Sequence, residues 1–520
     1  MALLRSAATV GSLTLASRFL GFGRDVLIAN AIGTGLVAQA FVVAFRFPNL
    51  FRNLFAEGAF NSAFVPLFAK RLEAHGPANA QAFAEDVMSV LFAWVLLFVA
   101  VAVLAMPLLI YAIAWGFAGD QEKLDLSVGL ARVAFPYLLF MSLAALLSGV
   151  LNSTHRFAAA AAAPILLNLT LIVALLIANI AGWGDDERTG YALVTGVFIA
   201  GVAQFALLWM AAARAGFALR LGLPRLSNDV RRLVALAVPG LIAGGITQFN
   251  LLVATQIASS FDRAVSYLYY ADRIYQLPLG VVGVAIGVVL LPDLSRKLRT
   301  NNSSDAIISQ NRALELALFL TIPAAIAIIT AADPIIRTIF EHGAFTRSDS
   351  YATSSALTAF AVGLPAFVMI KVFAPGFFAR EDTRTPMKYA IVSVAVNLVS
   401  ALILSRFFRH VGIAAATAIA AWVNTSALAL TLALRGQFAP DERLRWRLTR
   451  IIAAAILMGV LLVAGRYAAG DAFTGEGSRL ARVSALAALV GMGAGAYFAA
   501  AHFLGAMTWG ELKETLRQRR

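Results

Sequence analysis

The sequence contains no cysteine and few charged residues. Of its 520 residues, 13% are charged and 60% are apolar, and the formal net charge is +14. Without cysteine, neither a disulfide framework nor a thiolate metal site can form. The five histidines are scattered and none has a second ligand at helical spacing, so no metal centre is predicted. A glycine-rich loop of the nucleotide-binding type is also missing, so we expect no ATP hydrolysis by this chain.

Long apolar runs dominate what is present. Mean hydropathy is +0.80, and about fourteen apolar runs, each long enough to cross a bilayer as a helix, follow one another along the chain. They lie near residues 8–32, 36–62, 84–113, 127–151, 160–181, 190–213, 232–257, 267–291, 312–332, 351–378, 386–405, 412–434, 447–467 and 481–504. The basic residues stand between these runs, a pattern typical of membrane topology and not of a nucleic-acid-binding face. No clear cleavage site follows the first run, which predicts a retained helix. The sequence therefore predicts an all-α polytopic membrane protein with about fourteen transmembrane helices.

Lysine and arginine gather in alternate loops, for example in 214–232 and 435–450, whereas intervening loops such as 120–125 and 185–187 are richer in acid. The positive-inside rule then places both termini in the cytoplasm. The acidic run Asp185–Glu187 could serve a membrane transferase as a metal-diphosphate site, but a short acidic loop is more typical of simple solvation.

An internal repeat relates two parts of the chain. Pro136 and Pro365 lie 229 positions apart, and each is followed 32 positions later by an Asn-Leu pair that begins at Asn168 or Asn397. Six spans per unit would keep both units in the same orientation, as in two-lobed secondary transporters whose site lies between the lobes. The predicted domains are a first six-helix lobe at 1–225, a second at 226–436, and an accessory pair of helices with a cytoplasmic tail at 437–520.

Charged residues interrupt several of the predicted spans. An arginine at bilayer depth costs several kcal/mol and persists where it faces protein or water. The candidate binding residues are Arg18, Arg24, Asp25, Arg46, Arg52, Glu57, Asp272, Arg273 and Lys371. Cations outnumber acids in this set, which predicts an anionic ligand. The alternatives are structural pairs, Arg18 with Asp25 and Asp272 with Arg273, or snorkelling of Arg46 and Arg52 to an interface.

Five segments carry a family resemblance that extends over essentially the whole chain. They are Ser17–Asp25 (SRFLGFGRD), Phe47–Leu50 (FPNL), Phe55–Pro66, Tyr269–Arg273 (YYADR) and Lys371–Phe377 (KVFAPGF). In these segments the chain resembles the MurJ/MviN family of lipid II flippases, in the multidrug/oligosaccharidyl-lipid/polysaccharide exporter superfamily. The resemblance implies a central cationic cavity between two six-helix lobes and a groove for the lipid tail formed by the accessory pair.

The same resemblance implies a function. The expected substrate is lipid II, moved from the inner to the outer leaflet of the bacterial cytoplasmic membrane by alternating access, with no cofactor and no nucleic acid involved. Membrane lipid and wall-synthesis proteins are the expected partners. By residue match, the essential charged positions are Arg18, Arg24, Asp25, Arg52, Glu57, Asp272, Arg273 and Lys371. The coupling force is open between membrane potential, sodium and protons.

The chain departs from the family pattern at two positions, and three other functions are compatible with parts of the sequence. Gln39 stands where relatives often carry an acid, which puts a proton or cation role there in doubt, and Arg46 replaces a frequent lysine with charge preserved. An exporter of drugs or of other lipid-linked oligosaccharides on the same fold is the main alternative, although an exporter of cations should carry acids in its cavity. A transferase would need acidic metal ligands at the membrane edge, and a scaffold would not explain desolvated arginines.

Overall fold

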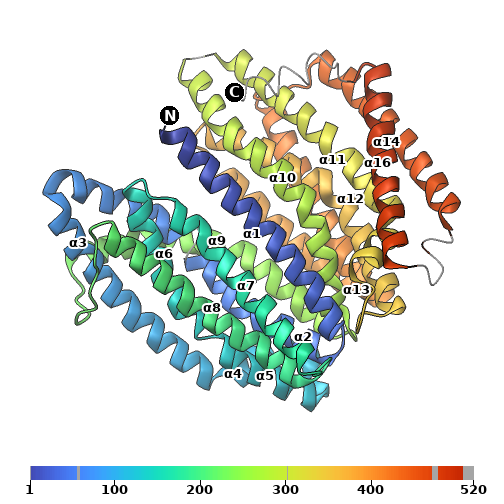
Figure 1. Cartoon of the computed structure of the whole chain (residues 1–520). Coiled ribbons are helices and arrows are strands. Elements are labelled where there is room, and N and C mark those ends of the chain that lie inside the picture. The colour runs from blue at the N-terminus through green and yellow to red at the C-terminus, as the bar shows by residue number, and fades with distance from the viewer. Residues whose placement is uncertain (1, 56–58, 301, 471–472, 474–477, 507–520) are drawn as a thin grey trace. The chain divides into compact units, whose positions relative to one another are not determined.

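Helices make up nearly all of the protein (Figure 1). The structure, a computed structural model, describes residues 2–55, 59–300, 302–470, 473 and 478–506, and these ranges contain no strand. The all-α prediction is therefore confirmed. By contacts between Cα atoms the chain divides into unit 1, Met1–Ser266 with His342–Thr346, and unit 2, Tyr267–Glu341 with Arg347–Arg520. The lobe boundaries at 225 and 436 were drawn from the sequence repeat and stay a prediction.

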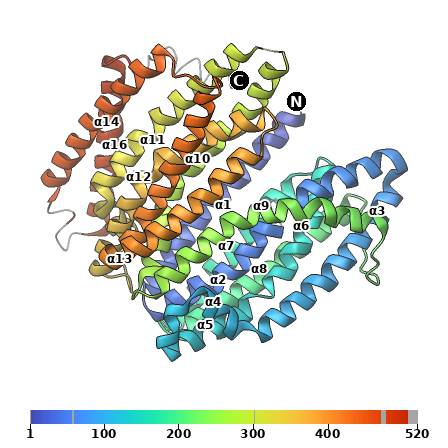
Figure 2. The ribbon, with the colours of Figure 1, turned by 180° about the vertical axis from the view of Figure 1, so that it is seen from behind.

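Unit 1 is a bundle built from the first helices. They are α1 (Ala2–Ile32), α2 (Leu36–Phe55), α3 (Ala59–Leu104), α4 (Met106–Ile113), the 3-10 helix η1 (Trp115–Gly119), α5 (Gln121–Ala134), α6 (Tyr137–Ser153), α7 (Ala158–Ile180), α8 (Glu187–Arg214) and α9 (Asn228–Ser259). In this bundle α1 packs along α7, and α7 along α8 (Figure 2). Two of the acids in the predicted outer loops cap helices, since Asp120 and Asp186 accept hydrogen bonds from the first-turn amides of α5 and α8.

Phenylalanine rings form the core where α2 meets its neighbours. Phe51 of α2 lies 5.0 Å from Phe98 of α3 and 6.0 Å from Phe135, measured between ring centroids, and Phe47 lies 5.6 Å from Phe135. Edge-on and tilted ring pairs of this kind add about 0.5–1.5 kcal/mol each to the burial of their apolar surface. The cluster fixes α2 and therefore the two arginines that α2 carries.

The turn between α1 and α2 interlocks with a distant loop of unit 1. Gly33 has a φ of +55°, and a Cβ on it would lie 2.4 Å from the carbonyl oxygen of Ala344. Gly343 has a φ of +58°, and its Cβ would lie 2.3 Å from the carbonyl oxygen of Asn30. The amide of Ala344 donates to that same Asn30 oxygen at 2.9 Å. Both positions need glycine, because of the left-handed backbone and because of the close approach.

Unit 2 holds the longer helices and the predicted accessory pair. They are α10 (Ala264–Arg299), whose first residues fall in unit 1, α11 (Ser303–Phe340), α12 (Arg347–Phe378), α13 (Arg384–Leu434), α14 (Glu442–Ala468) and α16 (Arg479–Phe503). Helix α13 breaks at Arg409, where φ is +49°. The break lies between the two spans predicted at 386–405 and 412–434. Helices α14 and α16 run beside each other and along α11 (Figure 1).

Hydrophobic length supports a membrane protein. Within the ranges that the structure covers, nine helical segments are long and apolar enough to cross a membrane. Helices α1 and α2 are outside this set, because arginine and other polar residues interrupt their apolar stretches. The prediction of fourteen spans stays a prediction.

Candidate functional site

Arg24 and Asp25 form a buried ion pair on α1. Their side chains expose only 9% and 5% of their surface, and Asp25 Oδ1 accepts hydrogen bonds from Arg24 Nη2 at 2.6 Å and from Nε at 3.1 Å. The sequence had offered Arg18, seven residues earlier, as the partner of Asp25. Instead Asp25 binds the adjacent Arg24, and Arg18 is exposed and borders a cavity between α1 and α7.

Asn168 of α7 connects the Arg24–Asp25 pair of α1 to α7. Its Oδ1 accepts a hydrogen bond from Arg24 Nη1 at 2.9 Å, and its Nδ2 donates to the backbone oxygen of Ser17 at 2.8 Å. Asn168 is buried, as is Asn397 at the equivalent repeat position on α13. Sequence reasoning used both residues as repeat markers and missed their place in the site. The fixed offset from Pro136 and Pro365 was the signal that could have found them.

The arginines of α2 meet neutral partners. Half-buried Arg46 donates to the hydroxyl of Thr255 on α9, which in turn donates to the oxygen of Leu251 at 2.7 Å. Arg52 is also half-buried, and its Nη2 lies 3.2 Å from Oδ1 of Asn53. Glu57, the remaining candidate of this segment, lies outside the described residues. Hydroxyl and amide partners orient a guanidinium without cancelling its charge.

The candidate residues of unit 2 lie on α10 and α12. Asp272 accepts a hydrogen bond from Gln276, one turn further along α10, and the guanidinium of Arg273 lies over the ring of Tyr269 at 4.6 Å. An aromatic face holds a cation in place. Both charged residues are half-buried.

The side chain of Lys371, on α12, lies against α10 at Gly283. A Cβ on Gly283 would lie 2.6 Å from Cδ of Lys371 and 2.9 Å from Cε. The absence of a side chain at Gly283 therefore lets the lysine stem lie directly against the α10 backbone, while Lys371 as a whole remains exposed. Gly283 follows Arg273 by ten residues, about 15 Å along the axis of α10.

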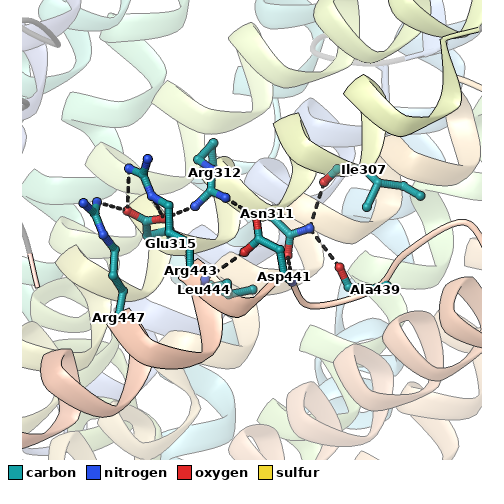
Figure 3. A network of polar contacts seen from close by, with 9 residues as sticks. All are labelled: Ile307, Asn311, Arg312, Glu315, Ala439, Asp441, Arg443, Leu444 and Arg447. Atoms are coloured by element: carbon teal, nitrogen blue, oxygen red, sulfur yellow. Dashed lines mark hydrogen bonds and ion pairs between the residues drawn. The ribbon is translucent and has the colours of Figure 1, made fainter.

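A second set of charges joins α11 to α14, and sequence reasoning missed it (Figure 3). Glu315 of α11 is only 5% exposed and is bound by three arginines: Arg312, Arg443 at 3.3 Å and Arg447. Arg312 also binds Asp441, whose carboxylate caps α14 by accepting from the amide of Leu444 at 2.7 Å. Every carboxylate in this cluster is matched by arginine.

Ion pairs also hold the other end of α11. Glu341 accepts from Arg337 Nε at 2.9 Å and lies 3.4 Å from Arg482 at the start of α16, while Asp333 lies 3.7 Å from Arg466 at the end of α14. The accessory pair is thus fastened to α11 at both ends. Between the ends, α11, α14 and α16 enclose an apolar cavity of about 240 Å³. Phe319, Met458, Leu489 and Tyr497 are among its walls.

The two units together define a class of protein. Long apolar helices that carry guanidiniums, bound on α1, α2 and α10 by a carboxylate, amides, a hydroxyl and an aromatic ring, are typical of a multi-pass membrane transporter. The fold agrees. A solved structure of a multidrug resistance MATE family transporter of the MOP superfamily matches with a TM-score of 0.69 at 13% identity, over 82% of this chain and 98% of that one.

The chain belongs to the lipid II flippase MurJ family, whose model matches residues 28–474. It is 48% identical to the probable lipid II flippase MurJ of Rhizobium meliloti (strain 1021), over 100% of this chain and 97% of the relative. It is 46% identical to the corresponding protein of Rhizobium tropici, over 100% and 98%. A solved lipid II flippase MurJ in an inward closed conformation matches its fold with a TM-score of 0.79 at 24% identity, over 95% and 98%.

Proposed function

We propose that this protein moves lipid II, a polyprenyl diphosphate that carries a peptide-linked disaccharide, from the inner to the outer leaflet of the bacterial cytoplasmic membrane. Membership of the lipid II flippase MurJ family supports this function. The observation that carries it in the structure is the buried Arg24, which is bound to Asp25 on the same helix and to Asn168 on α7. The protein would act as a transporter and carry out no covalent chemistry.

The physical problem is the head group. A diphosphate with sugars and a peptide is too polar to cross hydrocarbon unaided, whereas the polyprenyl tail stays in lipid at no cost. Guanidiniums can replace the water around the diphosphate, since each binds two phosphate oxygens with parallel hydrogen bonds. Arg18, Arg24, Arg46 and Arg52 of unit 1, and Arg273 and Lys371 of unit 2, are the residues proposed to do so by alternating access. Glu57, Asp25 and Asp272 would tune their charge.

The apolar cavity among α11, α14 and α16 suits the lipid tail. Its walls are aliphatic and aromatic side chains, and the ion pairs at both ends of α11 keep those walls in place. We propose that part of the polyprenyl chain lies there while the head group is carried.

The direction of transport follows from the proposed orientation, with both termini in the cytoplasm. Single cysteines in this cysteine-free chain give the test. Arg220→Cys should react with a membrane-impermeant maleimide only after the cytoplasmic side is exposed, and Glu187→Cys should react in intact cells. The reverse pattern would overturn the orientation.

Transport itself is tested by depletion and replacement. In cells depleted of their own flippase, this chain should restore growth and return lipid II from the inner to the outer leaflet. In liposomes the purified protein should expose labelled lipid II to an external enzyme. Continued accumulation in the inner leaflet, with the protein folded and present, would overturn the proposal.

A further inference from the structure

A groove in unit 1 contains Arg18 and otherwise only residues that have not so far been assigned to substrate. Two neighbouring cavities, of about 450 and 430 Å³, open along α1 and share Phe157 at the start of α7. The first is bordered by Thr9, His155, Arg156 and Arg214, and the second by Thr14, Ser17 and Arg18. We call the two together the α1–α7 groove.

The lining of the groove suits an anion. Three arginines and one histidine border it, and neither cavity has a carboxylate among its lining residues. Arg156 and Arg214 are both exposed, and Arg156 Nη1 donates to the backbone oxygen of Arg214 at 3.3 Å. The floor consists of small residues such as Ala160 and Pro164, which leave room for a bulky group.

Hydrogen bonds connect the groove to the buried Arg24. From Thr9 to Arg18 is nine residues of helix, about 14 Å. Beside the second cavity, the carbonyl oxygen of Ser17 accepts a hydrogen bond from Nδ2 of Asn168. Oδ1 of the same Asn168 side chain accepts a hydrogen bond from Arg24 at 2.9 Å. Arg156 and Arg214 line the first cavity and Arg18 the second, and Asn168 connects Ser17 of the second cavity to Arg24.

We propose that the α1–α7 groove is an entry site, where the diphosphate of a polyprenyl-linked head group is first bound on its way to Arg24. This inference rests on the proposed function and orientation, which place Arg156 and Arg214 at the cytoplasmic face. Arginine is suited to such a site because its fork binds phosphate oxygens in pairs. A series of cations lets the anion move from one guanidinium to the next without becoming fully hydrated in between.

The test measures binding directly, in the purified full-length chain. Thr9→Cys places a single thiol at the groove, and its rate of reaction with a maleimide is followed with farnesyl diphosphate, phosphatidylglycerol or inorganic diphosphate present. Farnesyl diphosphate should slow labelling, and the other two should do so only at much higher concentrations. Ser304→Cys, a thiol on unit 2, should be indifferent to all three.

Charge removal then locates the contact. Arg156→Gln with Arg214→Gln, in the Thr9→Cys background, should raise the protecting concentration of farnesyl diphosphate by about a hundredfold, roughly tenfold for each charge-assisted contact. The matched pair Arg384→Gln with Arg445→Gln, two exposed arginines outside the groove, should leave it unchanged.

Three results would overturn the inference: no protection by farnesyl diphosphate, equal protection by phosphatidylglycerol or inorganic diphosphate, or protection that survives removal of Arg156 and Arg214. Failure of the proposed function is seen separately. A wild-type chain that protects Thr9→Cys but moves no lipid II in liposomes would overturn the function alone. A groove variant that moves lipid II at the wild-type rate would remove the groove from the path.

Discussion

Two clusters of arginine in this protein differ in what surrounds them. On α11 and α14, Glu315 binds three guanidiniums and Asp441 shares one of them, so every arginine of this cluster is bound to a carboxylate. On α1 and α2, Asp25 binds Arg24, while Asn168, Thr255 and Asn53 are neutral partners that accept from arginines. A cluster in which every arginine is bound to a carboxylate stabilises a contact between helices, whereas a neutral partner orients a guanidinium without cancelling its charge. The partners of an arginine therefore say more about its role than its depth does.

Removal of Arg24 should have the largest effect. Arg24→Ala should abolish complementation of flippase-depleted cells, because the loss of one member of a buried charged contact costs about 2–5 kcal/mol. Arg24→Lys should restore only part of the activity, since lysine lacks the fork. Arg24→Ala with Asp25→Asn separates charge from folding, because no buried carboxylate is left alone. Normal growth with that double variant would remove Arg24 from the transport path.

Glu315→Gln should lower the stability of the protein and largely keep its transport, the opposite emphasis to Arg24→Ala. It leaves three arginines around a neutral amide, and we expect a loss of about 3–5 kcal/mol in unfolding free energy, with transport per folded molecule largely kept. Thermal unfolding of the purified protein gives the first quantity, and lipid II exposure normalised to folded protein gives the second. Glu442→Gln, an exposed acid at the start of α14, is the matched control. Unchanged stability with lost transport would show that the two clusters share one role.

Gly283→Ala should lower transport several-fold by displacing Lys371. Its Cβ would lie 2.6 Å from Lys371 Cδ, closer than packed atoms allow. Lys371→Ala should also lower transport, and in that background Gly283→Ala should add little, because residues in direct contact give non-additive effects. Two fully additive losses would contradict the proposed close approach.

Asp382→Asn should have the smallest effect, and one that depends on pH. The carboxylate, in the loop before α13, accepts from Arg435 at 2.7 Å and from Thr385 at 2.7 Å, and these contacts hold the pKa of Asp382 well below its ordinary value. Its contribution is complete above the unfolded pKa of about 4 and is lost as pH falls through the lower folded pKa. Because the pair is partly exposed, we expect under about 1 kcal/mol at neutral pH. Melting curves should show the gap between wild type and variant closing in acid, and a gap that widens would contradict this account.

Hydrophobic runs predicted helices well, and contacts between helices poorly. The span predicted at 160–181 is α7, at Ala158–Ile180, and the break predicted between 405 and 412 falls at Arg409. Helix α14 begins at Glu442, five residues before the predicted span at 447–467, because Asp441 caps it and its first turns are charged. Hydropathy cannot detect such a start.

The partners of the site residues were beyond the reach of sequence for a related reason. Arg24 meets Asn168 across 144 positions, and Arg46 meets Thr255 across 209. Such pairs depend on which faces of α1, α2, α7 and α9 pack together, and apolar periodicity in long helices that are apolar on most sides does not specify this. The excess of cations was visible in the sequence, whereas the neutral residues that orient them were not.

The interlocked turns at Gly33 and Gly343 bear on the order of folding during synthesis. The amide of Ala344 donates to the backbone oxygen of Asn30, 314 positions earlier. The turn after α1 therefore cannot make this contact until most of the chain has been synthesised. Contacts of such long sequence separation form late, after other packing has offset the entropy cost of closing the loop. Unit 1 therefore leaves the ribosome unfinished and is completed by a five-residue segment, His342–Thr346, from the middle of the later chain. A nascent chain stopped before residue 342 would lack that segment however well its helices had inserted.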